Sequence, residues 1–228
     1  MAKKVKSTVK SKKTKPAVKS TKAKPAVKSK KSFMQKFKDE FSTTALVLIP
    51  IGIAINQIGR LISTALALPV FLDTIGTVFM AMLAGPWVAG IGGFLTNVVT
   101  AIAYGRPTSV FFGTVQLFIG LVVGLFVYKG WLKKPLPVLG TGVLLAVTAA
   151  FVSSIISTLV AGGVSGSGVD VVVAVFLAAG QKYWTSMVGA RIITESIDKI
   201  IAVFVPWLSV KRLPEKYARL FKYTNKIR

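Results

Sequence analysis

From residue 41 onward, the sequence is a series of long apolar stretches separated by short breaks of polar residues, glycine and proline. An α-helix needs about 20 mostly apolar residues to cross the roughly 30 Å hydrocarbon core of a bilayer. The breaks divide the chain into six expected spans, at 43–66, 71–86, 87–104, 110–129, 137–162 and 184–209. The run 170–180 is too short to cross, since eleven residues make only about 16 Å of helix; if it crossed, the count would change, and five or seven spans stay open here. The pattern predicts an all-α membrane protein, a six-transmembrane-helix bundle.

Half of the basic charge lies in the first 40 residues, which hold fifteen of the thirty Lys and Arg residues and only two acidic ones. This tail is low in complexity, repeats KPAVKS at 15–20 and 24–29, and contains no apolar run typical of a signal peptide. Such a segment buries too little apolar surface to offset the entropy of ordering it, so we expect disorder. Its lysines suit anionic lipid headgroups. Nucleic acid is the weaker reading and is not an expected partner, because no arginine or aromatic residues interleave the lysines.

The distribution of charge predicts how the bundle lies in the membrane, because cytoplasmic loops are enriched in Lys and Arg. With the tail in the cytoplasm, six spans place the loop 129–134 and the segment after residue 210 on the same side. These two segments carry ten basic residues, whereas the opposite side has only Arg60, Arg106 and Lys182. We therefore expect a multi-pass protein of the cytoplasmic membrane with both termini in the cytoplasm. Its parts are the tail (1–40), a transmembrane substrate-binding domain (41–212) and a basic C-terminal tail (213–228).

Cysteine and histidine are both absent. Thiol nucleophiles, zinc sites with sulfur or imidazole ligands and histidine-dependent triads are thereby excluded. Only five acidic residues lie beyond residue 40, which is few for paired-carboxylate catalysis or a magnesium site. We therefore expect a protein that is not an enzyme and that holds no metal and no cofactor.

Polar side chains within the spans are costly, so each marks a candidate functional position. In the expected topology they converge on the outer half of the bundle, where apolar walls with a few polar groups are typical of a small-molecule site. The candidates are Asn56, Arg60, Asp73, Asn97, Tyr104, Arg106, Gln116, Gln181, Tyr183 and Trp184. The alternative is that the arginines snorkel to the interface and the amides bridge helices.

The last span has the sharpest charge pattern. Arg191, Glu195 and Lys199 follow one another at intervals of four residues and share one helical face, with Asp198 beside them. Charges at this depth must face the bundle interior or another protein and must be paired. Arg191 and Glu195 are candidates for substrate binding, and Asp198 and Lys199 for coupling to a partner. A proton relay has little support, because no second buried carboxylate is evident on another span.

Small residues at four-residue spacing predict close helix packing, as lipid offers no hydrophobic drive for association. Gly85, Ala89 and Gly93 form one such series, and Gly120 and Gly124 form a GxxxG pair. In a glycine-rich membrane protein such pairs also arise by chance.

Three runs resemble the substrate-binding S component of energy-coupling factor (ECF) vitamin transporters: IPIGIAIN (49–56), LPVFLDTIGT (68–77) and LAGPWVAGIGGFLTN (83–97). The run ESIDKIIAVFVPWLSVKRLP (195–214) is similar to the close of many such proteins, so the resemblance covers about 43–215 and leaves out the lysine tail. It implies a six-helix bundle that captures a vitamin-like substrate from outside. The bundle then docks on a membrane scaffold subunit with two ATPase subunits and topples to release its cargo inside. ATP would bind those partners, because this chain has no GxxxxGK[ST] loop.

One motif departs from that family. S components often dock through an Ala-x-x-x-Ala motif in the first helix, and 43–66 has none. The nearest small residues, Gly52 and Ala54, take the docking role in this interpretation. The cations of the outer side favour an anionic or strongly polar vitamin.

Two other function classes compete with the importer subunit. A self-sufficient transporter or channel for a small polar solute would need buried titratable groups on several spans, and in the sequence they are concentrated on one. A membrane-embedded enzyme would need a nucleophile–base pair or a metal cluster, and the sequence indicates neither.

Overall fold

The computed structural model describes residues 33–38, 40–163 and 165–228. In these residues all regular structure is helical. The helices are α1 (Phe33–Lys38), α2 (Thr43–Ala65), α3 (Ile75–Leu83), α4 (Pro86–Ala103), α5 (Ser109–Lys129), η1 (Trp131–Lys133), α6 (Pro135–Val160), α7 (Val169–Ala178), α8 (Tyr183–Arg212), α9 (Glu215–Ala218) and η2 (Thr224–Lys226). Most of the lysine tail predicted over 1–40, including both KPAVKS repeats, lies outside the described residues.

Four helices, α2, α4, α5 and α6, are long and apolar enough to cross a membrane. α8 is longer still, at 30 residues, but carries four charged residues between 191 and 199. α7 has ten residues, about 15 Å of helix, in agreement with the prediction that 170–180 does not span. The chain is therefore an all-helical protein suited to a membrane.

Over the second expected span, 71–86, the structure differs from the prediction. Its helical part, α3, has only nine residues, about 14 Å, which is too short to cross a bilayer by itself. The preceding stretch, 66–74, is not helical and contains two non-glycine residues in the left-handed region, Ala67 (φ 48°) and Leu72 (φ 53°). Such backbone conformations cost about 1–3 kcal/mol each and persist only where surrounding contacts hold them.

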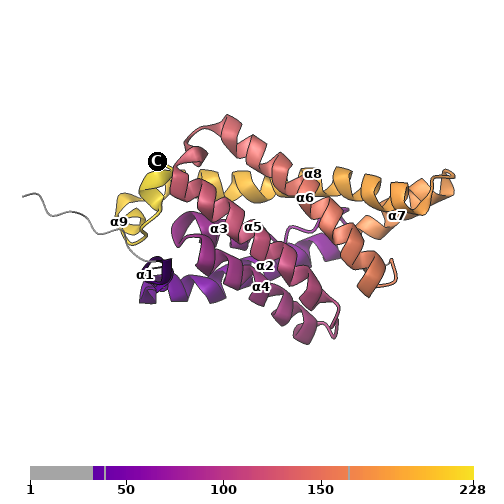
Figure 1. Ribbon diagram of the computed structural model, residues 1–228, viewed down its shortest axis with the longest axis horizontal. Coiled ribbons are helices and arrows are strands. Elements are labelled where there is room, and N and C mark those ends of the chain that lie inside the picture. Colours follow the sequence, from indigo (N-terminus) through magenta and orange to yellow (C-terminus); the bar gives the residue numbers. More distant parts are fainter. Residues whose placement is uncertain (1–32, 39, 164) are drawn as a thin grey trace, which may run out of the picture. The chain divides into compact units, whose positions relative to one another are not determined.

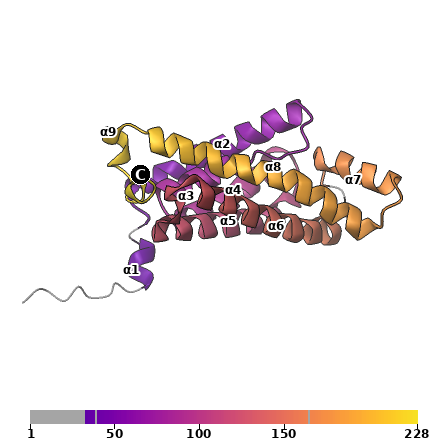
Figure 2. The same cartoon turned by 90° about the horizontal axis from the view of Figure 1, so that it is seen from above.

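The helices form two groups. α2, α3, α4 and α5 pack on one another, and α6, α7 and α8 form the second group, with α7 beside the start of α8 in both views (Figures 1 and 2). The groups meet mainly where α3 contacts α8, and more sparsely where α5 contacts α6. We call the end with α9 and the C-terminus the α9 end, and the opposite end the α7 end (Figure 1).

Glycine allows α4 and α5 to approach closely, as the small-residue spacing predicts. A Cβ on Gly120 would lie 2.4 Å from the backbone nitrogen of Gly90, and one on Gly124 would lie 2.4 Å from the Cα of Pro86. Gly85 has a different role, because it enters α4 with a φ of 105° that other residues rarely adopt.

The α9 end is closed by contacts among segments far apart in sequence. Glu40, only 7% exposed, accepts hydrogen bonds from the backbone N–H of Trp87 (2.9 Å) and from the hydroxyl of Tyr223 (3.0 Å). The indole of Trp207 on α8 donates to the carbonyl of Leu132 (2.7 Å). Burial raises the pKa of Glu40 above its ordinary value, although these two donors and the charge of Lys222 act in the opposite direction. The C-terminal segment is therefore part of the folded structure.

Candidate functional site

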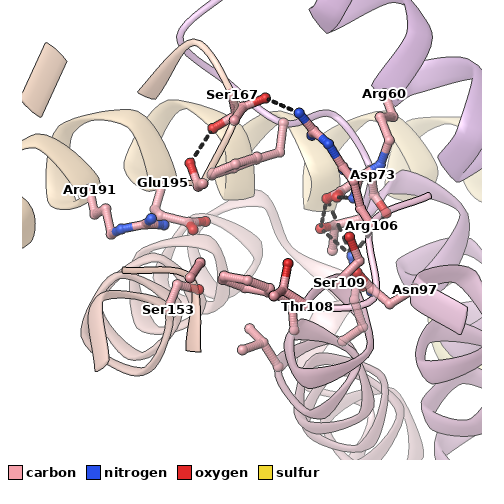
Figure 3. Close-up of a pocket in the computed structure, with 18 of the residues that line it drawn as sticks. Arg60, Asp73, Asn97, Arg106, Thr108, Ser109, Ser153, Ser167, Arg191 and Glu195 are labelled. Carbon is pink, nitrogen blue, oxygen red and sulfur yellow. Dashed lines mark hydrogen bonds and ion pairs between the residues drawn. The ribbon is translucent and has the colours of Figure 1, made fainter. Parts of the chain in front are cut away.

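A cavity of about 260 Å³ lies between the two helix groups, toward the α7 end. One wall comes from α4 and α5 and the other from α6 and α8, while the stretch 66–74 and the loop after α6 complete it. Figure 3 shows Arg191, Glu195 and Ser153 at one side of the cavity and Arg60, Asp73 and Asn97 at the other. The apolar lining includes Phe71, Phe112, Val115 and Ile119.

A buried group of charges on α8 forms the base of the site. The ammonium of Lys199 contacts Asp198 (2.5 Å), Glu195 (2.8 Å) and the hydroxyl of Thr74 (3.3 Å). Lys199 therefore donates hydrogen bonds to Asp198 and Thr74 and forms an ion pair with Glu195. Lys199, Glu195 and Asp198 are at most 3% exposed, which agrees with the expectation that the charged face of this helix points into the protein and is paired.

The same group holds the non-helical stretch 66–74 in place. One carboxylate oxygen of Asp198 accepts hydrogen bonds from the backbone N–H groups of Phe71 (3.1 Å) and Leu72 (2.6 Å). Backbone amides away from water need such partners, because an unpaired one costs about as much as a lost hydrogen bond. Asp198 of α8 thus accepts hydrogen bonds from two backbone N–H groups that no helix or sheet pairs.

Asp73, near the end of this stretch, belongs to a second polar cluster. Its carboxylate pairs with Arg60 of α2. The amide of Gln116 on α5 donates to the carbonyl of Asp73 (2.9 Å) and to the hydroxyl of Thr74 (3.1 Å). The predicted residues Arg60, Asp73 and Gln116, from three different elements, therefore meet at the cavity.

Two nitrogen donors of Arg191 have no hydrogen-bond acceptor in the described residues. Its side chain is 0% exposed, and one terminal nitrogen donates to the hydroxyl of Ser157 (2.5 Å). Its Nε and other terminal nitrogen have no acceptor among the described residues. The amide nitrogen of Asn97, 2% exposed, is likewise without an acceptor in the part of the chain that the structure describes. Buried donors in native proteins are nearly always paired, so donors that line a cavity point to a ligand.

A glycine-rich loop covers part of the cavity at the α7 end. Asp170 accepts from the backbone N–H groups of Ser165 (3.1 Å) and Gly166 (2.6 Å), which shapes the loop. The guanidinium of Arg106, before α5, donates to the carbonyl of Gly166 (3.0 Å). Arg106 thereby connects the start of α5 with this loop.

Several predicted binding residues lie elsewhere. Asn56 is fully buried and bridges three helices: its amide donates to Thr77 (2.9 Å) and Thr96 (3.1 Å) and accepts from the N–H of Gly76 (2.7 Å). It does not line the cavity, so the helix-bridging alternative describes it. The residues Tyr104, Gln181, Tyr183 and Trp184 are exposed and also lie outside the lining.

The residues predicted to dock a partner are mostly internal. Asp198 and Lys199 have their polar atoms engaged inside the protein and present no surface to a partner. Gly52 is buried against Met80, and Ala54 alone of the four is exposed.

The sequence analysis missed the serines of α6 and the loop. Ser153 lines the cavity and Ser157 holds Arg191, and both lie on one face of α6. Their four-residue spacing was a usable signal. Ser165 and Ser167 lie in the glycine-rich linker 162–170, and the place of that linker on the expected outer side was the signal for them.

No three acidic residues come together as a metal site in the described ranges. Comparisons of the chain with protein-family models, curated proteins and solved structures found no match.

Proposed function

We propose that this protein is the membrane-embedded capture subunit, or S component, of an ECF-type ATP-driven importer, and that it binds a vitamin-like solute in the cavity. The observation that carries the proposal is that Arg191 and Asn97, on opposite walls of one cavity, both have buried donors without an acceptor among the described residues. Such a cavity, with apolar walls and a few convergent polar groups, is the usual make-up of a small-molecule site. The sequence resemblance supplies the importer class.

The proposed topology has six passages. Besides the four apolar helices, α8 would cross, since 30 residues make about 45 Å of helix and its central charges are internal. The stretch 66–74 together with α3 would form the second passage, as non-helical backbone is tolerated at membrane depth where protein buries it. The basic segments then gather at the α9 end, on the cytoplasmic side with both termini, and the cavity faces outward.

The test is binding by the purified chain in detergent or nanodiscs. A panel of vitamins and their precursors is titrated, and any small molecule released on denaturation is identified by mass spectrometry. We expect one compound to bind tightly, no ATP hydrolysis by the chain alone, and a scaffold subunit with two ATPases on mild purification from cells. Absence of binding across the panel together with no released compound would contradict the proposal.

One observation favours a second candidate, an ion-coupled carrier that works alone. Asp73 lies on a different segment from Glu195 and Asp198, yet the hydroxyl of Thr74 connects them, because it donates to Asp73 and accepts from Lys199, which pairs with the other two. The carboxylates are thus less confined to one span than the sequence indicated. Uptake of the bound compound by liposomes that contain only this chain would favour the carrier, and uptake that needs the ATPase subunits would favour the importer.

A further inference from the structure

The four cations that line the cavity differ in how many of their N–H groups are already used. Lys199 donates to Asp198 and Thr74 and forms an ion pair with Glu195. Arg60 is paired with Asp73, and among its buried nitrogen atoms only Nε has no acceptor in the described residues. Arg106 is exposed and holds the loop carbonyl of Gly166. Arg191 alone among them is fully buried with two nitrogen atoms, Nε and Nη1, that donate to nothing in the described structure.

The nearest carboxylate does not satisfy this arginine. Glu195 is one helical turn from Arg191, and Figure 3 shows the two side chains pointing toward one another. The ion pair of Glu195, however, is with Lys199, at 2.8 Å. No hydrogen bond or ion pair joins the two in the described residues, so Nε and Nη1 of Arg191 are open to an acceptor that enters the cavity.

The charges around the cavity are already balanced in number. Four cations line it, against the carboxylates of Asp73 and Glu195, with Asp198 behind Lys199 and Asp170 holding the loop 165–167. An incoming anion should therefore add as little negative charge as possible. Charges away from water are stable only when compensated, so a monoanion suits this site better than a phosphate ester with two charges.

We infer that the captured solute carries one carboxylate, which binds the guanidinium of Arg191 between α6 and α8; this rests on the proposed function. Guanidinium and carboxylate match in shape and form strong charge-assisted hydrogen bonds. The body of the solute packs on Phe112, Val115 and Ile119 of α5. A carbonyl or hydroxyl at its other end accepts from the free amide of Asn97.

The cavity volume limits the solute to a small molecule. At about 30 Å³ per water, 260 Å³ holds about nine water molecules. This suits a compact acid.

The experiment uses acids and their neutral analogues of nearly equal shape: nicotinate and nicotinamide, biotin and biotinamide, pantothenate and panthenol, lipoate and lipoamide. Each is titrated into the purified full chain by calorimetry, and the compound released on denaturation is identified. Loss of a charge-assisted hydrogen-bond pair corresponds to about 10- to 100-fold in affinity. We expect one acid to bind at least tenfold more tightly than its neutral analogue.

Three variants test whether Arg191 causes the preference for the acid. Arg191→Gln should remove the preference for the acid, so that the acid and its neutral analogue bind with similar, weak affinity. Arg191→Lys should keep part of the preference, and it provides the measurement if the glutamine variant does not fold. Arg219→Gln, an exposed arginine paired with Glu215 on α9, is the control and should bind as the unaltered protein does.

The outcomes separate the inference from the proposed function. Equal binding of acid and neutral analogue, an unchanged preference in Arg191→Gln, or a released compound without a carboxylate overturns the inference while capture of a solute stands. If no compound binds and nothing is released, the proposed function fails and the inference fails with it.

Discussion

At the scale of single residues, the same side-chain type serves different purposes, and the folded environment decides which. Asn56 and Asn97 are both buried asparagines that the sequence marked as binding candidates. Asn56 has partners on both sides of its amide, whereas the nitrogen of Asn97 has none in the described structure and lines the cavity. The first connects helices, and the second is available to a ligand.

The two asparagines should therefore separate stability from binding. Asn56→Ala leaves the N–H of Gly76 unpaired and removes bonds among three helices, so we expect the free energy of unfolding to fall by about 1–3 kcal/mol. Asn97→Ala should leave stability almost unchanged and weaken solute binding by about 1 kcal/mol. Thermal unfolding in detergent and calorimetric titration measure the two effects. The reverse pattern would mean that the two roles are exchanged.

Much of the site could be predicted from the sequence, because charged and amide side chains in apolar spans have few possible explanations. That reasoning found Arg60, Asp73, Asn97, Arg106, Gln116, Arg191 and Glu195, all of which line the cavity. It assigned Asp198 and Lys199 to docking, although both are internal. The sequence of a helical face does not show whether lipid, a partner or the same chain packs against it. The same reasoning also missed the unwound stretch 66–74, since an apolar run reads as a span whether or not its backbone is helical.

At the scale of elements, the close approach of α4 and α5 depends on the absence of side chains on α5. Both helices are among the four that are apolar and long enough to cross a membrane, so hydrophobic burial alone does not hold them together. Van der Waals contact between backbones replaces it at Gly120 and Gly124. The spacing in the sequence predicted close packing at these glycines, but not that α4 and α5 are the pair that meets.

A methyl group at the first of these glycines should disturb the pair. Gly120→Ala places a Cβ 2.4–2.5 Å from the backbone of Gly90 and Ala89, so we expect the free energy of unfolding to fall by about 3 kcal/mol. Gly140→Ala on α6 is the matched control, because nothing lies within 4 Å of its added methyl group. Alanine is the better helix former there and should raise stability by up to about 1 kcal/mol. Equal effects of the two changes, measured by thermal unfolding, would contradict the close packing of α4 and α5.

At the scale of the whole molecule, the two ends have different chemistry. The α7 end holds the cavity and its glycine-rich loop, and the α9 end holds the basic segments and the contacts of Glu40 with Trp87 and Tyr223. This polarity agrees with a protein that receives a solute at one face and interacts with anionic lipid at the other.

The absence of cysteine makes the proposed sidedness simple to test. Gln181→Cys and Lys216→Cys each introduce one thiol at an exposed position, near the α7 end and in α9 respectively. In whole cells we expect a membrane-impermeant maleimide to label the first and to reach the second only after permeabilisation. Labelling of Lys216→Cys in intact cells would mean that the α9 end faces outward, contrary to the proposed topology.

The contact of Glu40 should make stability depend on pH in one direction. Because the pKa of Glu40 is raised in the folded protein, the folded state binds this proton more tightly than the unfolded state. Its contribution to stability is then complete below the ordinary pKa of 4.5 and is lost as the pH rises through the raised value. We expect the thermal midpoint of Glu40→Gln, relative to the unaltered protein, to increase over this interval. A constant difference between Glu40→Gln and the unaltered protein over this interval would contradict the expectation.

The hold of Asp198 on Phe71 and Leu72 has a mechanical consequence. Because these hydrogen bonds join α8 to the unwound stretch, a tilt of α8 would displace Asp73 together with Arg191. We expect any change in the width of the cavity to occur where α5 meets α6, since the two helix groups have fewer contacts there than between α3 and α8. A solute that bridges Asn97 on α4 and Arg191 on α8 would connect the two helix groups and so reduce their movement relative to one another.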